Sequence, residues 1–273
     1  MPSPRRLARQ LANRRVPLRT RLGLVVVGAR RRLRPADVYA VRYGQGILHL
    51  SHDDLGVDRA SLDFVLAEEA YATDYRGTLV LDIGAHKGYF GAYALAHGAR
   101  TVVSFEPERA NVALLDRTAA TFRAVGGDWD VRGVAVGPLA GEAELHVMRA
   151  SWGHALHPPD EFAEHEVGTQ RVPIRALADV LADAERVADG ARIVAKINIE
   201  GEECATVLGT PPEAWHGVSE AFVETHAWAP CDADQLTAHL VPAGLRRAAS
   251  VHPVVLRLRR AGAPRPGRPS APG

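Results

Sequence analysis

The sequence has few cysteines and no long apolar run. Its two cysteines, Cys204 and Cys231, are not part of the dense cysteine framework that is typical of a small secreted domain. We therefore expect a reducing, cytoplasmic setting and no disulfide. No apolar stretch approaches the roughly 18 residues that a membrane-spanning helix needs, so we expect no transmembrane segment.

Acidic residues are missing from the first 36 positions, which contain 11 Arg. Residues 37–256 combine 15 Arg and 2 Lys with all 32 acids of the chain, which gives this body a net charge of −15. An acidic body argues against nucleic acid as a partner. We expect residues 1–36 to be a basic arm, poorly ordered in part, that either binds an anionic partner or has no binding role.

Lysine is also scarce, since the chain contains 31 Arg but only 2 Lys. Both Lys87 and Lys196 lie within the segments that carry the motifs described below. The ammonium group of Lys is a compact point charge, unlike the planar fork of Arg. Both positions are therefore candidates for a specific role.

Residues 77–260 alternate between short apolar runs and amphipathic stretches, which predicts an α/β domain with a mostly parallel, Rossmann-like sheet and helices on both faces. Helices are predicted at residues 90–97 and 108–124. The predicted strands cover residues 79–83, 101–105, 130–136, 143–148, 171–174, 192–199, 218–225, 245–249 and 254–258.

Several segments lie outside this alternation. Residues 37–76 are predicted to form an N-terminal extension, with a β-hairpin at 38–51 and a helix within 58–75. The apolar run at 22–29 is compatible with a strand or a helix. We expect an irregular insert at 149–170 that covers the site, and a disordered tail at 261–273, which is rich in Pro, Gly and Arg.

The most informative stretch is the turn Asp82-Ile83-Gly84-Ala85-His86-Lys87-Gly88, which joins a predicted strand to a small-residue helix. In an α/β sheet, such a turn presents free amide groups to a ligand in the crevice at the strand ends. Its glycine spacing does not match the dinucleotide fingerprint, and no Lys-Ser or Lys-Thr pair follows the last glycine as in a P-loop.

Two acids indicate the kind of ligand. Asp82, just before the turn, would repel a pyrophosphate but could hold a cationic group. Glu106 ends the next strand, where a carboxylate can accept hydrogen bonds from both ribose hydroxyls of an adenosine. A ligand with a ribose, an ammonium group and no phosphate satisfies both acids, and S-adenosylmethionine is the common cofactor of that description.

Three motifs then resemble the FkbM-type family of class I methyltransferases: LDIGAHKGYFGAYAL, VVSFEPERANVALLDR and VAKINIEGEECATVL. The family carries an Asp-x-Gly-Ala-Asn-x-Gly turn, a Phe-Glu-Pro strand end and a Lys-Ile-Asp-x-Glu-Gly-x-Glu segment. The match covers roughly residues 62–226. The resemblance implies a seven-stranded sheet, S-adenosylmethionine as cofactor, and O-methylation of sugars or secondary-metabolite scaffolds.

The resemblance also implies which residues hold the cofactor. The turn residues Asp82, Gly84, Ala85, His86 and Gly88 would hold its methionine part, and Glu106 its ribose. Ala135, at the end of the third strand, would lie beside the adenine, and Asn198 belongs to the same set. The sequence departs from the family at two of these positions, since the family has Asn in place of His86 and Asp in place of Asn198. An amide at position 198 keeps an acceptor but is unsuited to act as a base.

Methyl transfer to a hydroxyl needs a base near the acceptor. Our candidates are His226 and Glu200, at the ends of the predicted fifth and fourth core strands, and His154 in the insert. Lys196 lies in an apolar strand and requires an acidic partner, for which Asp82, Glu200 and Glu224 are the options. Glu200, Glu224 and His226 could assemble oxygen and nitrogen ligands for Mg²⁺, but the missing carboxylate at 198 argues against it, and we predict no metal site.

The sequence thus predicts a cytoplasmic, S-adenosylmethionine-dependent O-methyltransferase that acts on a small-molecule hydroxyl, on a sugar or a secondary-metabolite scaffold. Two alternatives stay open. One is methyl transfer to a nitrogen or a carboxylate, and the other is a non-catalytic nucleoside-binding homologue, which the departures at His86 and Asn198 would favour.

Overall fold

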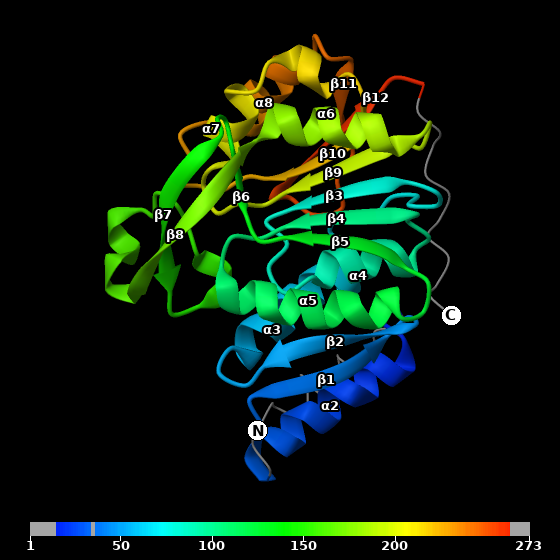
Figure 1. The fold of residues 1–273 in the computed structure, drawn as a ribbon, viewed down its shortest axis with the longest axis vertical. Coiled ribbons are helices and arrows are strands. Elements are labelled where there is room, and N and C mark those ends of the chain that lie inside the picture. Colours follow the sequence, from blue (N-terminus) through cyan, green and yellow to red (C-terminus); the bar gives the residue numbers. More distant parts are fainter. Residues whose placement is uncertain (1–14, 34–35, 263–273) are drawn as a thin grey trace.

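The computed structural model describes residues 15–33 and 36–262. At its centre is a seven-stranded sheet in the order β11-β12-β10-β9-β3-β4-β5 (Figure 1). These strands are β3 (Leu79–Ile83), β4 (Thr101–Phe105), β5 (Asp128–Arg132), β9 (Ile193–Ile197), β10 (Val218–Glu224), β11 (Leu245–Ala248) and β12 (Val255–Arg260). Strands β3, β4, β5, β9 and β10 run parallel to one another, and β12 lies antiparallel between β10 and β11. The predicted mostly parallel, Rossmann-like sheet is confirmed.

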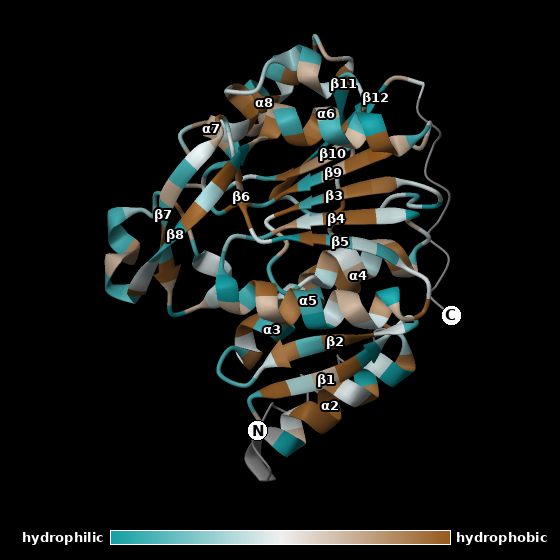
Figure 2. Cartoon of the chain, viewed as in Figure 1, coloured by the Kyte–Doolittle hydropathy of each residue, from teal (hydrophilic) through white to brown (hydrophobic). Residues whose placement is uncertain are grey.

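The central strands are buried on both faces, which explains why the sequence shows continuous apolar runs instead of alternation. Every residue of β3 and of β9 is buried. Helices α4 (Tyr89–Ala96) and α5 (Arg109–Arg123) cover one face, and α6 (Leu177–Ala188) and α8 (Ala233–Leu240) cover the other (Figure 1). Figure 2 shows the hydrophobic strands between these two helical layers.

The sheet reverses its winding between β3 and β9, which are hydrogen-bonded neighbours although all the elements from α4 to α6 separate them in sequence. The chain leaves β3 toward β4 on one side and later returns to β9 on the other. Ligands of open α/β sheets bind in the crevice at such a switch point, outside the carboxyl ends of the strands.

The N-terminal extension consists of α2 (Leu18–Leu33), β1 (Val38–Tyr43), β2 (Gly46–Ser51), α3 (Leu55–Leu62) and the π-helical turn η1 (Asp63–Ala67). The predicted hairpin is confirmed by the antiparallel β1–β2 pair. It packs on α5, where the Ile47 N–H donates to Thr121 Oγ1 at 2.9 Å. The run at 22–29 is helical. The helix expected within 58–75 was wrong in its bounds, because it begins at Leu55 and its π turn ends at Ala67.

The expected third strand at 130–136 was also wrong in its bounds. Strand β5 ends at Arg132, and the chain turns there, with the Val134 N–H donating to the Arg132 carbonyl at 2.9 Å. Residues beyond the turn form β6 (Ala135–Gly137), which belongs to a separate three-stranded sheet with β7 (Gly141–Met148) and β8 (Glu166–Ala176). Ala135 therefore does not lie at the end of the third core strand.

The insert is shorter than expected, because β8 begins at Glu166. Residues 149–165 contain two 3₁₀ helices, η2 (Ser151–Gly153) and η3 (Asp160–His165). A short helix, α7 (Glu203–Leu208), and the 3₁₀ turn η4 (Pro212–Trp215) complete the domain. No helix within 15–33 or 36–262 is long and apolar enough to cross a membrane. Residues 1–14 of the basic arm and 263–273 of the expected disordered tail lie outside the described residues.

Candidate active site

A cavity of about 390 Å³ opens at the carboxyl ends of the parallel strands, at the switch point between β3 and β9. The turn after β3, the ends of β4, β9 and β10, the small sheet, η2 and the extension all contribute to its walls. Of the predicted site residues, the following line it: Gly84, Ala85, His86, Glu106, Ala135, His154, Asn198 and Glu200. Asp82, Gly88 and His226 are not among the lining residues.

The turn after β3 passes so close to the end of β9 that it excludes a side chain at Gly84. A Cβ atom there would lie 1.7 Å from the Asn198 carbonyl oxygen, and Gly84 has a positive φ of 75°. His86 also has a positive φ, 52°, and His is one of the few residue types enriched in the left-handed region together with Asn and Asp. The departure from the family's Asn at this position is therefore compatible with the same backbone shape.

Glu106, the acid after β4, is a buried and hydrogen-bonded carboxylate of the cavity wall. It is only 6% exposed, and its two oxygens accept hydrogen bonds from the backbone N–H groups of His86 at 2.8 Å and Glu108 at 3.0 Å. Burial raises the pKa of Glu106 to about 7, although these hydrogen bonds oppose the shift. The acid thus connects the turn after β3 to the start of α5.

Asp82 has a different role from the one we predicted. Its carboxylate is fully buried and pairs with Lys196 Nζ at 3.3 Å, so it is enclosed between strands and does not reach the cavity. Lys196 Nζ also donates to the Gly84 carbonyl at 2.5 Å. Asp82 and Lys196 therefore brace the turn from behind, and the expectation that Asp82 contacts a ligand directly is corrected. Of the three partners considered for Lys196, Asp82 is the one within ion-pair distance.

Lys87 anchors the other side of the turn. Its ammonium group is 2% exposed and lies 2.6 Å from Asp58 Oδ1 and 3.1 Å from Asp54 Oδ2. It also donates to Ser151 Oγ at 3.0 Å, and His86 Nε2 hydrogen-bonds to the same hydroxyl at 2.7 Å. These contacts join the turn to the extension and to η2. Sequence reasoning missed Asp54 and Asp58, because nothing near them in the chain marks them as partners of a motif residue.

The end of the cavity near β9 and β10 is acidic. Glu200 and Glu224 both line it, and burial raises the pKa of Glu200 to about 8, with the nearby charge of Glu224 adding to the shift. Burial likewise raises the pKa of Glu224, whose carboxylate accepts a hydrogen bond from the Tyr71 hydroxyl. Glu200 has a positive φ of 52°, which places its side chain at a sharp turn between β9 and α7.

His226 lies behind this acidic end and outside the cavity lining. Its Nε2 is 3.3 Å from Glu203 Oε1, and its ring stacks on Trp228 at 4.5 Å between centroids. Burial lowers the pKa of His226, but the carboxylates of Glu203, Glu200 and Glu224 more than offset this and raise it above its ordinary value. The geometry does not favour the predicted role of His226 as the base that contacts an acceptor.

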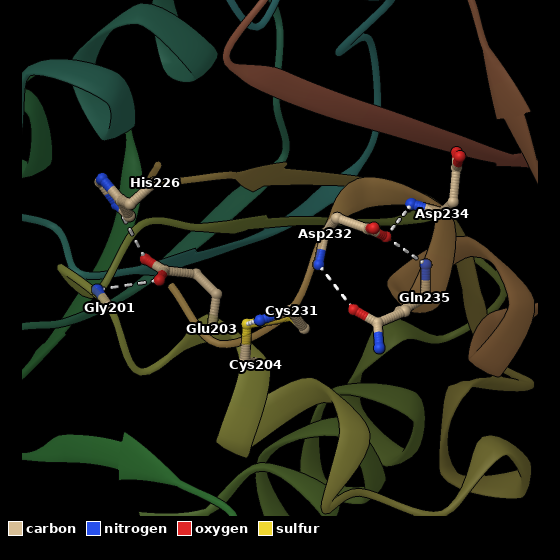
Figure 3. Close-up of a disulfide and its surroundings, with 8 residues drawn as sticks. All are labelled: Gly201, Glu203, Cys204, His226, Cys231, Asp232, Asp234 and Gln235. Atoms are coloured by element: carbon tan, nitrogen blue, oxygen red, sulfur yellow. Dashed lines mark hydrogen bonds and ion pairs between the residues drawn. A yellow bond between two sulfur atoms is a disulfide. The ribbon is translucent and has the colours of Figure 1, made fainter. Parts of the chain in front are cut away.

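Glu203 is a further residue that sequence reasoning did not assign. It is buried, and besides its ion pair with His226 it accepts hydrogen bonds from the backbone N–H groups of Ile199 at 2.7 Å and Gly201 at 2.9 Å. Figure 3 shows the contacts with His226 and Gly201. The available signal was the last Glu of the family's Lys-Ile-Asp-x-Glu-Gly-x-Glu segment, which falls on this position. Glu203 holds the loop that presents Asn198 and Glu200 to the cavity.

His154 lines the cavity from the insert. Its Nδ1 accepts a hydrogen bond from the Met148 N–H at 2.9 Å, which fixes the ring. Burial lowers the pKa of His154, although the charges of Glu108 and Asp54 oppose the shift. The neighbouring Trp152 lines the same wall and is half exposed.

The expectation of unpaired cysteines was wrong. Cys204 at the start of α7 and Cys231 before α8 form a disulfide, with Cα atoms 5.7 Å apart (Figure 3). This separation lies in the usual range for disulfides. The number of cysteines in a sequence does not indicate how far apart they lie in the fold. Here the fold brings two cysteines that are 27 residues apart in sequence into contact. The disulfide ties α7 to the loop that follows β10 and carries His226.

The possible Mg²⁺ ligands are not arranged as a metal site. Within the described ranges, no group of three or more His, Cys, Asp and Glu side chains is placed to hold a metal ion. Glu224 is engaged by Tyr71 and His226 by Glu203.

No family model and no curated protein sequence matches the chain. Among solved structures, a methyltransferase FkbM from Methylobacillus flagellatus KT is similar at 15% identity and a TM-score of 0.44, covering 77% of this chain and 55% of that one. The magnesium protoporphyrin IX methyltransferase (ChlM) from Synechocystis PCC 6803, solved with bound SAM, has 13% identity and a TM-score of 0.43, and the match covers 77% of this chain and 83% of that one. A SAM-dependent methyltransferase from Agrobacterium tumefaciens has 9% identity and a TM-score of 0.40, covering 82% and 70%. The chain thus spans about half the length of the first of these proteins.

Proposed function

We propose that this chain is an S-adenosylmethionine-dependent methyltransferase that methylates a hydroxyl group of a small molecule. The observation that carries the proposal is the arrangement of Glu106. A buried carboxylate, fixed by two backbone N–H groups, borders a cavity at the switch point of a Rossmann-like sheet. Such a carboxylate suits the two hydroxyls of a ribose and would repel phosphate groups beside it.

The cavity wall fits the rest of the cofactor. Ala135, with the apolar side chains of Val136 and Leu145, offers a surface for an adenine ring. Asn198 Oδ1 is buried and has no hydrogen-bond donor among the described residues, which leaves an acceptor for the cofactor's ammonium group. This role replaces the one first expected for Asp82. When bound, S-adenosylmethionine supplies an electrophilic methyl group on a sulfonium.

In this proposal Glu200 is the base. It lines the cavity, and a pKa raised to about 8 is close to the operating pH, which is where general-base catalysis is most efficient. Glu200 would accept the proton of the acceptor's hydroxyl and later release it to water, while the bound cofactor would supply the methyl group, give up its sulfur–methyl bond and leave as the neutral demethylated thioether. Trp152 offers a half-exposed ring at the same wall, which suits stacking on a sugar or another planar scaffold.

An amine acceptor is the second candidate. Glu200 and Glu224 together would attract a cationic amine to the acidic end of the cavity.

Calorimetric titration with S-adenosylmethionine and its demethylated product tests the cofactor assignment. We expect Glu106→Ala to weaken both affinities by roughly 10- to 100-fold, since hydrogen bonds to a charged group are worth about 1.5–3 kcal/mol. Glu161→Ala, at an exposed position in η3, is the matched control and should bind as the unmodified protein does. Unchanged binding by Glu106→Ala would contradict the ribose assignment.

Methyl transfer from a labelled cofactor to paired hydroxyl and amine acceptors separates the two candidates. With a hydroxyl acceptor, Glu200→Gln should lower kcat by roughly 100-fold or more, because the base is lost. With an amine acceptor that is already neutral, the same variant should keep most of its kcat and raise KM. The absence of transfer to any acceptor, despite tight cofactor binding, would favour a non-catalytic nucleoside-binding protein.

A further inference from the structure

Helix α2 exposes a row of large apolar side chains. Leu18 is 57% exposed, Leu22 49% and Val26 51%, and the three follow one another at intervals of four residues. Single exposed apolar residues are ordinary on protein surfaces, and Leu139 or Val187 of this chain are examples. Three in one row on a single helix form a continuous apolar strip on the outside of the molecule.

This strip lies opposite the face that α2 packs inward. Leu24, Val27 and Thr20 are buried, and the Thr20 hydroxyl donates to the Arg42 carbonyl of β1 at 2.6 Å. Figure 1 shows α2 on the far side of the hairpin from the central sheet. The helix is thus apolar on two opposite faces, whereas a surface helix ordinarily has one apolar and one polar face. The hairpin buries the inner apolar face of α2. The outer apolar face is exposed and is suited to contact a second apolar environment.

Arginines border the strip. Arg19 and Arg30 are exposed and lie within about 120° of arc with Leu18, Leu22 and Val26, at 3.6 residues per turn. Residues 15–33 contain six Arg and no acid, and residues 1–36 contain 11 Arg and no acid. An apolar strip flanked by Arg is the composition of helices that lie in the interface of an anionic membrane.

The charge of the remainder of the chain sets the orientation. Residues 36–262 combine 18 Arg and 2 Lys with 32 acids, a net charge of −12, so an anionic surface would repel the body and attract the end of the molecule that carries α2. Nucleic acid would use the arginines but would leave the apolar strip in water. The strip and the arginines together therefore favour a lipid surface over a polyanion alone.

We propose that the outer face of α2 docks this protein onto the surface of a bilayer that contains anionic phospholipids. Leu18, Leu22 and Val26 enter the boundary between headgroups and acyl chains, and the arginines contact lipid phosphates. Docking is peripheral, because α2 has 16 residues and arginines within the helix. The cavity residues contributed by the extension belong to α3, to η1 and to the loop after η1, so the site itself is not part of the docking face.

Flotation of the full chain with lipid vesicles tests the proposal. We expect binding to vesicles made of equal amounts of phosphatidylcholine and phosphatidylglycerol, little binding to phosphatidylcholine alone, and weakening as salt rises, because screening shortens the reach of the arginines. Leu22→Glu/Val26→Glu should reduce the affinity for the anionic vesicles by roughly 10-fold or more, since burial of each side chain is lost and two like charges are added.

Leu139→Glu/Val187→Glu is the matched control, because it adds the same two charges at exposed apolar positions away from α2. It should bind anionic vesicles like the unmodified protein. Circular dichroism checks that both variants are folded, and the lipid and salt dependence of the unmodified chain tests the proposal without any substitution. Equal binding to neutral vesicles, or equal loss in both variants, would overturn it. The proposal would also be overturned if the unmodified chain bound no vesicles and formed a dimer that the α2 substitutions convert to a monomer. In that case a second copy of the chain would cover the strip.

Discussion

The buried position of Glu106 predicts a stability that depends on pH. Its pKa of about 7 in the folded protein exceeds the ordinary value of about 4.5, because burial disfavours the carboxylate. The folded state therefore holds the proton more tightly, and the stability that this supplies is lost as pH rises from about 4.5 to 7. One pKa unit corresponds to about 1.4 kcal/mol, so Glu106 alone should lower the free energy of unfolding by about 2.5 kcal/mol between pH 5 and pH 8.

Glu106→Gln removes this titration. The amide can accept from only one of the two backbone N–H groups that face Glu106, those of His86 and Glu108. This costs about 1–3 kcal/mol at every pH. We therefore expect the variant to be the less stable protein at pH 5 and to recover relative to the unmodified protein by about 2–3 kcal/mol at pH 8.

Urea denaturation at the two pH values, followed by circular dichroism, measures the difference, and Glu164→Gln at an exposed position is the matched control. The comparison of two proteins at each pH cancels the other buried carboxyls that also titrate. A gap between Glu106→Gln and the unmodified protein that stays constant from pH 5 to pH 8 would refute the reasoning.

One substitution and one chemical reduction test the packing of the turn and the disulfide. Gly84→Ala should prevent cooperative folding, because its Cβ would lie 1.7 Å from the Asn198 carbonyl oxygen. The control Gly77→Ala also has a positive φ but has open space around its Cβ, so it should lower Tm by only about 2–8 °C. Similar thermal melting curves for the two variants would contradict this prediction. Reduction of the Cys204–Cys231 disulfide should lower the free energy of unfolding by about 3–4 kcal/mol for a loop of this length. The double Cys→Ser variant should not respond to reductant, and an unchanged urea midpoint of the reduced protein would show that the bond is absent.

The central strands of the sheet could be predicted because their burial leaves a pattern within each short stretch of sequence. Strands β3 and β9 are buried on both faces, so each appears as an uninterrupted apolar run between turn residues. The turn after β3 and the acid after β4 could be placed at the same edge, since the carboxyl ends of parallel strands meet there. The place of Glu106 in the cavity wall could therefore be predicted from its position alone.

The boundary of the third strand could not be predicted in the same way. The run from Val131 to Val136 is apolar enough to be one strand, but the backbone turns at Arg132 and Val134, and the second half pairs with β8. Which partner a strand edge chooses depends on segments more than 30 residues away. Periodicity carries no information on that choice.

The chemistry of the site was mispredicted where a side chain's partner decides its role. Asp82 was expected to face a ligand because it precedes a glycine turn, but alternation along β3 directs its carboxylate toward Lys196 on the neighbouring strand. His226 was expected to act as a base because it follows the fifth core strand, β10, but Glu203 holds it behind the cavity. Both errors have the same cause. The sequence indicates which strand end a residue lies at, but not which side chain of another segment pairs with it.

The surroundings of the two lysines explain why the chain has Lys at these positions and Arg at its other basic positions. Lys196 and Lys87 are both almost fully buried, and they brace the same turn from two sides. Lys196 does so from within the sheet through Asp82, and Lys87 from the side of the extension through Asp58. A planar guanidinium would need about five acceptors in a fixed fork, whereas an ammonium group needs only three and can rotate to meet them. The turn that presents Gly84 and His86 to the cavity therefore owes its shape to two buried ion pairs, and one of them makes it depend on the N-terminal extension.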